Sequence, residues 1–138
     1  MTWQYIVFDV LYIMNSKWKL LYYVKQDGTK PVEEYIKKCS INERAKTFAF
    51  IEHLKEKGPD LNRPYADLLE DGIHELRIKL TGEQVRILYF FCYKDIIILT
   101  NAFEKHSDKV PKSEIKTAKN NRDDFLSRYT EQEIRGLL

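Results

Sequence analysis

Three runs in the second half of the chain have the alternating or continuous apolar pattern that is typical of β-strands. They cover Ile73–Leu80, Gln84–Cys92 and Ile96–Phe103. Thr81-Gly82-Glu83 separates the first two runs, and Tyr93-Lys94-Asp95 separates the last two. Connections this short join only antiparallel neighbours. The pattern therefore predicts a three-stranded antiparallel meander.

The first half begins with a predicted strand and a short helix. Lys19–Lys25 is rich in bulky aliphatic and aromatic residues and ends at the turn signal Asp27-Gly28. Pro31 then opens a helix over Val32–Lys38, because proline is tolerated in the first helical turn. We expect this strand and helix to precede the meander in the same domain.

A second helix is predicted to follow. Ser40 or Asn42 can cap its start, it runs to about Lys57, and Gly58-Pro59 ends it. Its apolar residues follow three-four spacing, which predicts a buried stripe on one side of the helix. The stripe comprises Ala45, Phe48, Ala49, Ile51 and Leu54.

A final helix begins near Pro111 and extends to about Arg128. The order is then an N-terminal strand and two helices, a three-stranded antiparallel meander, and a C-terminal helix. With 138 residues in all, this order predicts one α+β domain over residues 17–138.

Residues 1–16 form an N-terminal extension of unknown role. Trp3–Met14 is mostly apolar, but it is too short to span a membrane and Asp9 interrupts it. It also lacks the basic start and small-residue cleavage site of a signal peptide. Three interpretations stay open: an added strand, a helix packed on the domain or on another subunit, or a natural translation start at Met14.

Composition excludes several classes of function. Cys39 and Cys92 lie far apart, which fits a reducing cytosol and argues against a disulfide framework. The histidines (His53, His74 and His106) are dispersed and have no metal-ligand spacing. There is no glycine-rich phosphate loop and no nucleophile elbow. We therefore expect a cytoplasmic protein with no metal and no cofactor.

Charge matters more in its distribution than in its net value of +2. In the predicted meander, Arg77 and Lys79 alternate with apolar residues, and the register that buries the apolar sets brings Arg86 to the same face. Three cations on neighbouring strands repel one another unless an anion lies between them. The pattern therefore indicates a site for an anion.

More basic residues follow the last predicted strand. Lys105, Lys109 and Lys112 lie where the chain leaves the sheet and enters a helix N-terminus. Basic side chains together with free backbone N–H groups can bind phosphate. Lys116 and Lys119, further along the helix, are more simply interpreted as a solvated face.

Several segments together resemble a known family. They are Asp71–Arg77, Val85–Phe90, Ile96–Lys105 and the helix positions Pro111, Glu114, Ile115 and Ala118. In order and spacing they are similar to the phage-derived HigB-like branch of the RelE/ParE toxin superfamily, over roughly Lys17 to Arg128. The chain departs from that pattern at His74, where an aromatic ring is usual, and at His106, where a second lysine is usual.

The resemblance implies a RelE-like fold and the toxin of a type II toxin–antitoxin system. Such a toxin is a metal-independent endoribonuclease that cleaves mRNA, often on the ribosome, and so inhibits translation and growth. The expected partners are a cognate antitoxin and mRNA that is free or bound to the ribosome, with no membrane.

The residue roles are assigned on this resemblance. Arg77 and Arg86 would hold the scissile phosphate, Lys105 would add charge, and His106 would be the general base or acid. RNA-binding residues would be Lys79, Lys109, Lys112 and Tyr65. In the plainer alternative, Arg77 forms a salt bridge with Glu75 or Glu104, and Tyr65 fills the edge of the core.

Two other functions compete with this one. A ParE-like relative would act on DNA gyrase through protein contacts and lack the ribonuclease residues. A non-catalytic module would bind RNA or antitoxin without turnover. Replacement of Arg77 or His106 separates these functions, because a ribonuclease should lose growth inhibition while it still binds its antitoxin.

Overall fold

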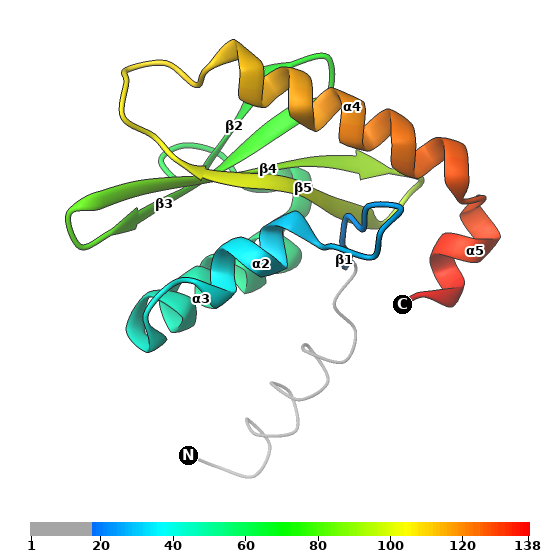
Figure 1. Cartoon of the computed structure of the whole chain (residues 1–138), viewed down its shortest axis with the longest axis horizontal. Helices are drawn as coiled ribbons and strands as arrows, with labels where there is room; N and C mark the ends of the chain where they lie inside the picture. Colours follow the sequence, from blue (N-terminus) through cyan, green and yellow to red (C-terminus); the bar gives the residue numbers. More distant parts are fainter. Residues whose placement is uncertain (1–17) are drawn as a thin grey trace, which may run out of the picture.

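The computed structural model describes residues 18–138, which form a mixed α+β domain around one five-stranded sheet (Figure 1). The strand order is β1-β5-β4-β3-β2. The strands are β1 (Lys19–Tyr22), β2 (Ala66–Glu70), β3 (Ile73–Leu80), β4 (Glu83–Cys92) and β5 (Ile96–Glu104). The helices are α2 (Pro31–Lys37), α3 (Ile41–Lys57), the 3-10 turn η1 (Gly58–Asp60), α4 (Lys112–Arg128) and α5 (Glu131–Gly136).

Strands β2 to β5 pair antiparallel, one after the next, and β1 pairs parallel with β5 at the other edge. The predicted meander is confirmed as β3, β4 and β5. The predicted strand count was wrong, because β2 adds a fourth antiparallel strand in a part of the chain for which the sequence analysis predicted neither a helix nor a strand. Ala66–Glu70 contains two acidic residues, and its strand conformation comes from pairing with β3.

Helices cover both faces of the sheet (Figure 1). On one face, α2 and α3 bury Val32, Ile36, Ile51 and Leu54 against apolar side chains of β3, β4 and β5. On the other face, Ala118 and Phe125 of α4 and Ile134 of α5 pack on Leu88, Phe90, Ile96 and Ile98. The contacts of α4 and α5 lie toward one end of the sheet, so α4 covers only that end of the face on which it packs.

Local chemistry explains where α3 begins and ends. The Ser40 side chain accepts a hydrogen bond from the Glu43 amide, and the Glu43 side chain accepts one from the Ser40 amide, which forms a capping box. Gly58 ends the helix at a φ of +54°, and a Cβ there would overlap the Trp18 ring. The sequence-based boundaries of this helix are therefore confirmed, with Ser40 as the cap.

The predicted buried stripe of α3 is only partly confirmed. Ile51 and Leu54 are buried, together with Thr47, whose hydroxyl donates to the Glu43 carbonyl oxygen. Phe48 is 46% exposed, and Ala45 and Ala49 are exposed as well. The predicted stripe therefore divides into a buried part and an exposed part. Residues three apart are offset around a helix with 3.6 residues per turn, so a series of such steps moves from one side of the helix to another.

The C-terminus contains a helix that the sequence analysis missed. α5 has only six residues, but the Thr130 side chain accepts from the Glu133 amide in a second capping box, and Ile134 is fully buried. Arg135 pairs with Asp95 in the β4–β5 turn at 2.9 Å. The predictions for residues 1–16 lie outside the described residues.

Candidate nucleic-acid-binding site

The end of the sheet that α4 leaves open carries a basic strip, which we define as Arg77, Lys79, Arg86 and Lys105. Arg77 and Arg86 are directly opposed in the β3–β4 register, and Lys79 is opposed to Gln84. The amide of Lys105 donates to the Gln84 carbonyl oxygen at 2.7 Å, which places Lys105 beside that second pair. The prediction that Arg77, Lys79 and Arg86 share a face is confirmed.

An anion does lie between the two arginines, and it is part of the protein. Glu75 comes from the same face of β3 and is only 2% exposed. Arg77 Nη1 donates to Glu75 Oε1 at 2.9 Å, and Arg86 Nε lies 3.3 Å from Glu75 Oε2. The second pair is not aligned as a hydrogen bond, and within residues 18–138 neither of its two atoms has another hydrogen-bond partner. Glu75 therefore ties both arginines into one cluster.

The two arginines differ in their access to solvent. The side chain of Arg86 is 3% exposed and also donates to the Val85 carbonyl oxygen and to Gln84 Oε1. Burial lowers its pKa, and the nearby Glu75 carboxylate opposes that change. The Arg77 side chain is 28% exposed and can meet a ligand. Arg86 thus lies under the strip, with Arg77 at its surface.

Arg77 borders two depressions. A groove of about 470 Å³ lies between β2, β3 and the start of α4, and a smaller one of about 210 Å³ lies beside Pro64. The larger groove is lined by basic residues (Arg63, Arg77, Lys105 and Lys109), acidic residues (Asp67, Glu70, Glu75 and Asp108) and apolar residues (Leu69, Val110 and Ile115).

Most acids of the larger groove already have cationic partners. Asp67 accepts from Arg63 at 2.7 Å, and Glu70 lies 3.5 Å from Lys119. Lys105 and Lys109 have no ion pair among residues 18–138, so their charges are available to a ligand. Of the acids that line the groove, Asp108 alone has no cationic partner in the described chain.

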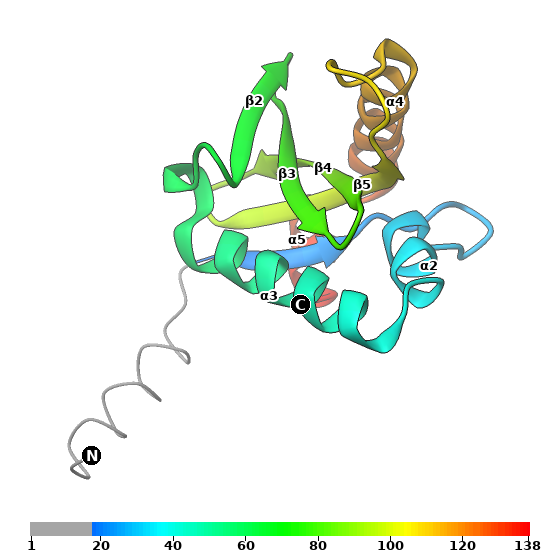
Figure 2. The same ribbon diagram turned by 90° about the vertical axis from the view of Figure 1, so that its left-hand side faces the viewer.

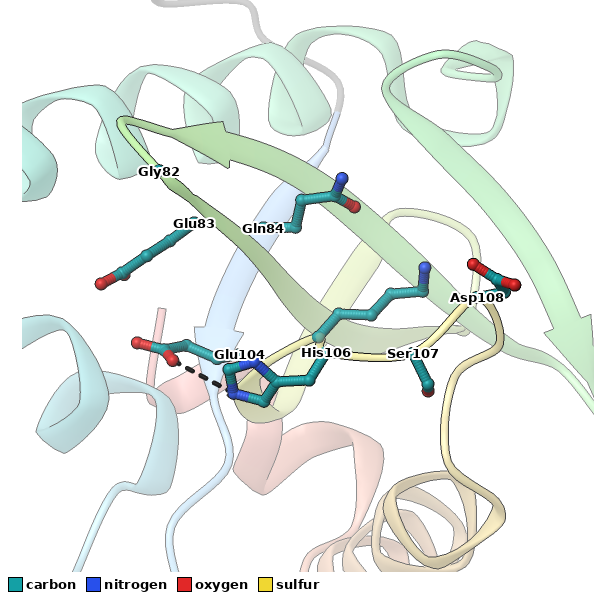
Figure 3. Close-up of a pocket in the computed structure, with 8 residues that line it drawn as sticks. Gly82, Glu83, Gln84, Glu104, His106, Ser107 and Asp108 are labelled. Carbon is teal, nitrogen blue, oxygen red and sulfur yellow. Dashed lines mark ion pairs between the residues drawn. The ribbon is translucent and has the colours of Figure 1, made fainter.

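His106 lies in a third depression, of about 390 Å³, at the end of β5 (Figure 3). Its side chain is 80% exposed, and its Nε2 is 3.3 Å from Glu104 Oε2. Glu104 also raises the pKa of the neighbouring Glu83 carboxyl through charge repulsion. Lys105 and Asp108 border both this depression and the larger groove. His106 and Arg77 are thus on two sides of Lys105.

The start of α4 closes the larger groove. Pro111 is its N-cap residue, and no side chain caps the helix. The positive end of the helix therefore adds to the charge of Lys109 and Lys112 at this side of the groove. Lys112 is exposed and has no ion-pair partner within the described residues.

Tyr65 and His74, which the sequence analysis singled out, lie outside the basic strip. Tyr65 packs edge-on against His53 of α3, with ring centroids 4.9 Å apart, and is 42% exposed. It therefore belongs to the α3 side of the sheet and not to the basic strip. His74 stacks on Tyr89 at 5.2 Å, and burial lowers its pKa.

Sequence reasoning considered Glu75 only as an alternative ion-pair partner of Arg77 and did not foresee that it joins both arginines. The signal was available, since Glu75 and Arg77 are two residues apart on a strand and must share a face. Its link to Arg86 required the register. Pairing of Glu104 with His106 was also missed, although these residues have the same spacing.

Among residues 18–138, no group of three or more His, Cys, Asp or Glu side chains could hold a metal ion. No helix in that part of the chain has the length and apolar character to cross a membrane.

One protein family matches this chain. The family is described as phage-derived protein Gp49-like (DUF891), and its match covers residues 34–123, which is more than half of the chain. The matched part includes all of the basic strip and most of α4. No curated protein matches.

Proposed function

This chain belongs to the phage-derived Gp49-like family, which is associated with toxin–antitoxin systems, and on that premise we propose that it is an RNA-cleaving toxin that needs no metal ion. One observation carries the proposal: a partly exposed Arg77, oriented by buried Glu75, lies next to Lys105, which has no ion pair in the described part of the chain. This pair of cations fits a phosphodiester in the open half of the sheet.

RNA carries its own nucleophile, which is why such a site can work without a metal. A base removes the proton of a ribose 2′-OH, and that oxygen attacks the adjacent phosphorus. The bond from phosphorus to the 5′-oxygen breaks, and an acid gives that oxygen a proton. The products end in a 2′,3′-cyclic phosphate and a 5′-hydroxyl.

The proposed roles follow the placement of each side chain. Arg77 and Lys105 contact the phosphate oxygens, where negative charge builds up in the transition state. Arg86, which is buried, holds Glu75 in place and so fixes the direction of the Arg77 guanidinium. In this scheme Arg86 is a positioning residue.

His106 is the proposed proton carrier. Glu104 can accept a hydrogen bond from His106 Nε2, from which it is 3.3 Å away, and this leaves Nδ1 to exchange a proton with the substrate. For Nδ1 and Arg77 to act on one phosphate, that phosphate must lie over Lys105, the residue between them.

Flanking nucleotides extend the contact in both directions. Lys79 lies beyond Arg77 along β3, and Lys109 and Lys112 lie at the N-terminus of α4. None of the three lysines has an ion pair among residues 18–138, so each can meet a backbone phosphate. A single strand is the expected substrate, and a cognate antitoxin is the expected inhibitor.

The test is induced expression in a bacterial host, with growth followed and total mRNA probed for cuts. Wild-type protein should arrest growth and cut mRNA, and Arg77→Ala and His106→Ala should reduce both effects. Lys116→Ala is the matched control, because Lys116 is exposed on α4, outside the strip, and it should behave like wild type.

The outcomes also separate the other functions. Growth arrest with intact mRNA would contradict the proposal and point to a protein target such as gyrase. A non-catalytic RNA-binding module is the second candidate, and the 80% exposure of His106 favours it, because nothing encloses the imidazole. That module would bind RNA without any cleavage.

A further inference from the structure

Part of the outward side of α3 is apolar, although it faces away from the core. Ile41, Ala45, Phe48 and Ala49, which we call the apolar face of α3, lie on one side of the helix by their three-four spacing. Ile41 is 75% exposed and Phe48 is 46% exposed. Two large apolar side chains, two turns apart on one side of a surface helix and joined by two alanines, form a patch that another segment can cover.

This face is separate from the proposed RNA site. α3 packs on one side of the sheet and α4 lies on the other (Figure 2). Arg77 and Lys105 border the groove at the start of α4. None of the depressions that Arg77 or Lys105 borders includes a residue of α3. The apolar face therefore needs an occupant of its own.

The chain enters the described structure at one end of this helix. Trp18 packs edge-on against Phe91, with ring centroids 5.2 Å apart, and its ring covers Gly58, the C-cap of α3. Leu20, further along β1, is half-buried against the same core. Residues 1–17 therefore connect to the domain beside the C-terminal end of α3.

The composition of that preceding segment complements the apolar face. In residues 3–14 the only residues that are not apolar or aromatic are Gln4 and Asp9. A run of this kind gains free energy by leaving water, at about 25 cal/mol for each Å² that it buries.

The lengths match as well. At 1.5 Å per residue, Phe48 lies about 15 Å from Gly58 along α3, and Ile41 lies about 25 Å from it. Residues 15–17 can span up to ~10 Å, and the twelve residues before them cover ~18 Å if helical and ~40 Å if extended. Residues 3–14 can therefore reach the whole apolar face from Trp18.

We propose that residues 3–14 pack on the apolar face of α3 of their own chain. A second copy is the less favourable occupant, because a standard interface buries about 800 Å² per partner and this face has only two large side chains. The short connection also gives the tethered segment an effective concentration in the millimolar range.

The test uses the full chain and the fluorescence of Trp3. The protein has two tryptophans, so Trp18→Phe leaves Trp3 as the only one. In this background the proposal predicts blue-shifted Trp3 emission, weak quenching by acrylamide, and no dependence on protein concentration. Adding Phe48→Asp should red-shift the emission and raise the quenching constant several-fold.

Leu126→Asp is the matched control, because Leu126 is 38% exposed on α4, and it should change neither signal. If Trp18→Phe does not fold, the difference between wild type and Trp3→Phe reports the same emission. Trp3 emission like that of free tryptophan in water would overturn the proposal. So would protection that appears only in a dimer on size-exclusion chromatography, which would assign the face to a second copy.

Discussion

Glu75 is the residue on which the site depends most, and its replacement by glutamine is a quantitative test. Glu75→Gln keeps the volume and one acceptor oxygen but removes the charge opposite Arg86, whose side chain is 3% exposed. Breaking a buried ion pair from one side costs about 3–5 kcal/mol, because the other charge stays buried. We expect about 3 kcal/mol here, since Arg86 keeps its bonds to Val85 and Gln84.

Two further variants make this expectation specific. Arg77→Gln should cost about 1 kcal/mol or less, because Arg77 is 28% exposed and Glu75 keeps its buried partner. Glu75→Gln combined with Arg86→Met removes both buried charges and should recover most of the lost stability. The double-mutant cycle should then give a coupling of at least about 2 kcal/mol between positions 75 and 86.

Urea unfolding at neutral pH measures these free energies, with the m-value as the check that the transition is unchanged. For a domain of this size, a loss of 3 kcal/mol corresponds to a drop in Tm of about 10 °C. A Glu75→Gln variant within about 0.5 kcal/mol of wild type would refute the reasoning. A larger loss for Arg77→Gln than for Glu75→Gln would refute it as well.

Three other predictions test separate parts of the structure. Hydrogen bonds from the Arg128 and Tyr23 side chains lower the pKa of the Asp124 carboxyl. The contribution of Asp124 to stability should therefore be full above pH ~4 and lost as the pH falls through the lowered pKa. In urea unfolding, Asp124→Asn should destabilise the protein at pH 7 and match wild type in strong acid. Gly58→Ala should lower the free energy of unfolding by about 3 kcal/mol, because the new Cβ adds backbone strain and overlaps the Trp18 ring. Gly82→Ala, which has open space around it, should lower that free energy by only about 1 kcal/mol in the same assay. Lys79→Gln should weaken RNA binding equally for all sequences and reduce the slope of log K against log salt by about 0.7, and an unchanged slope would exclude a phosphate contact there.

The sequence was most informative where a local rule decides the structure. The period of two in β3 and β4 is enough to put Arg77 and Arg86 on one face, because the other register would bury charges against the α2 and α3 side. The capping box at Ser40 and the break at Gly58 likewise decide the ends of α3.

Pairing between distant segments was beyond the sequence. β1 lies parallel to β5 with Lys19 opposite Ile96, and no local pattern indicates that partner. β2 is a strand because β3 provides the hydrogen bonds, and Leu68 in its middle is 58% exposed, so the usual burial pattern is absent. α5 did have a local signal in Thr130 and Glu133, which was overlooked because the helix is so short.

In the candidate site, too, local rules predicted some features, whereas others depended on contacts between distant segments. Alternation along the strands predicted which cations share a face, and the resemblance to toxins predicted their use. Only the structure shows which of these cations a ligand can reach, because Arg86 lies under the surface while Arg77 and Lys105 border the grooves. The sequence left Tyr65 open between RNA binding and packing at the edge of the core, because no local rule states on which side of a sheet edge a loop residue will pack. In the structure its ring packs against His53.

The most direct test of the central claim is cleavage of a labelled single-stranded RNA by the purified protein in excess EDTA. We predict cuts that leave a 2′,3′-cyclic phosphate and a 5′-hydroxyl, that stop where a 2′-deoxynucleotide replaces the nucleotide 5′ of the cut, and that fall at least a hundredfold in Arg77→Ala. An intact RNA at saturating protein, or cleavage that EDTA abolishes, would contradict the account.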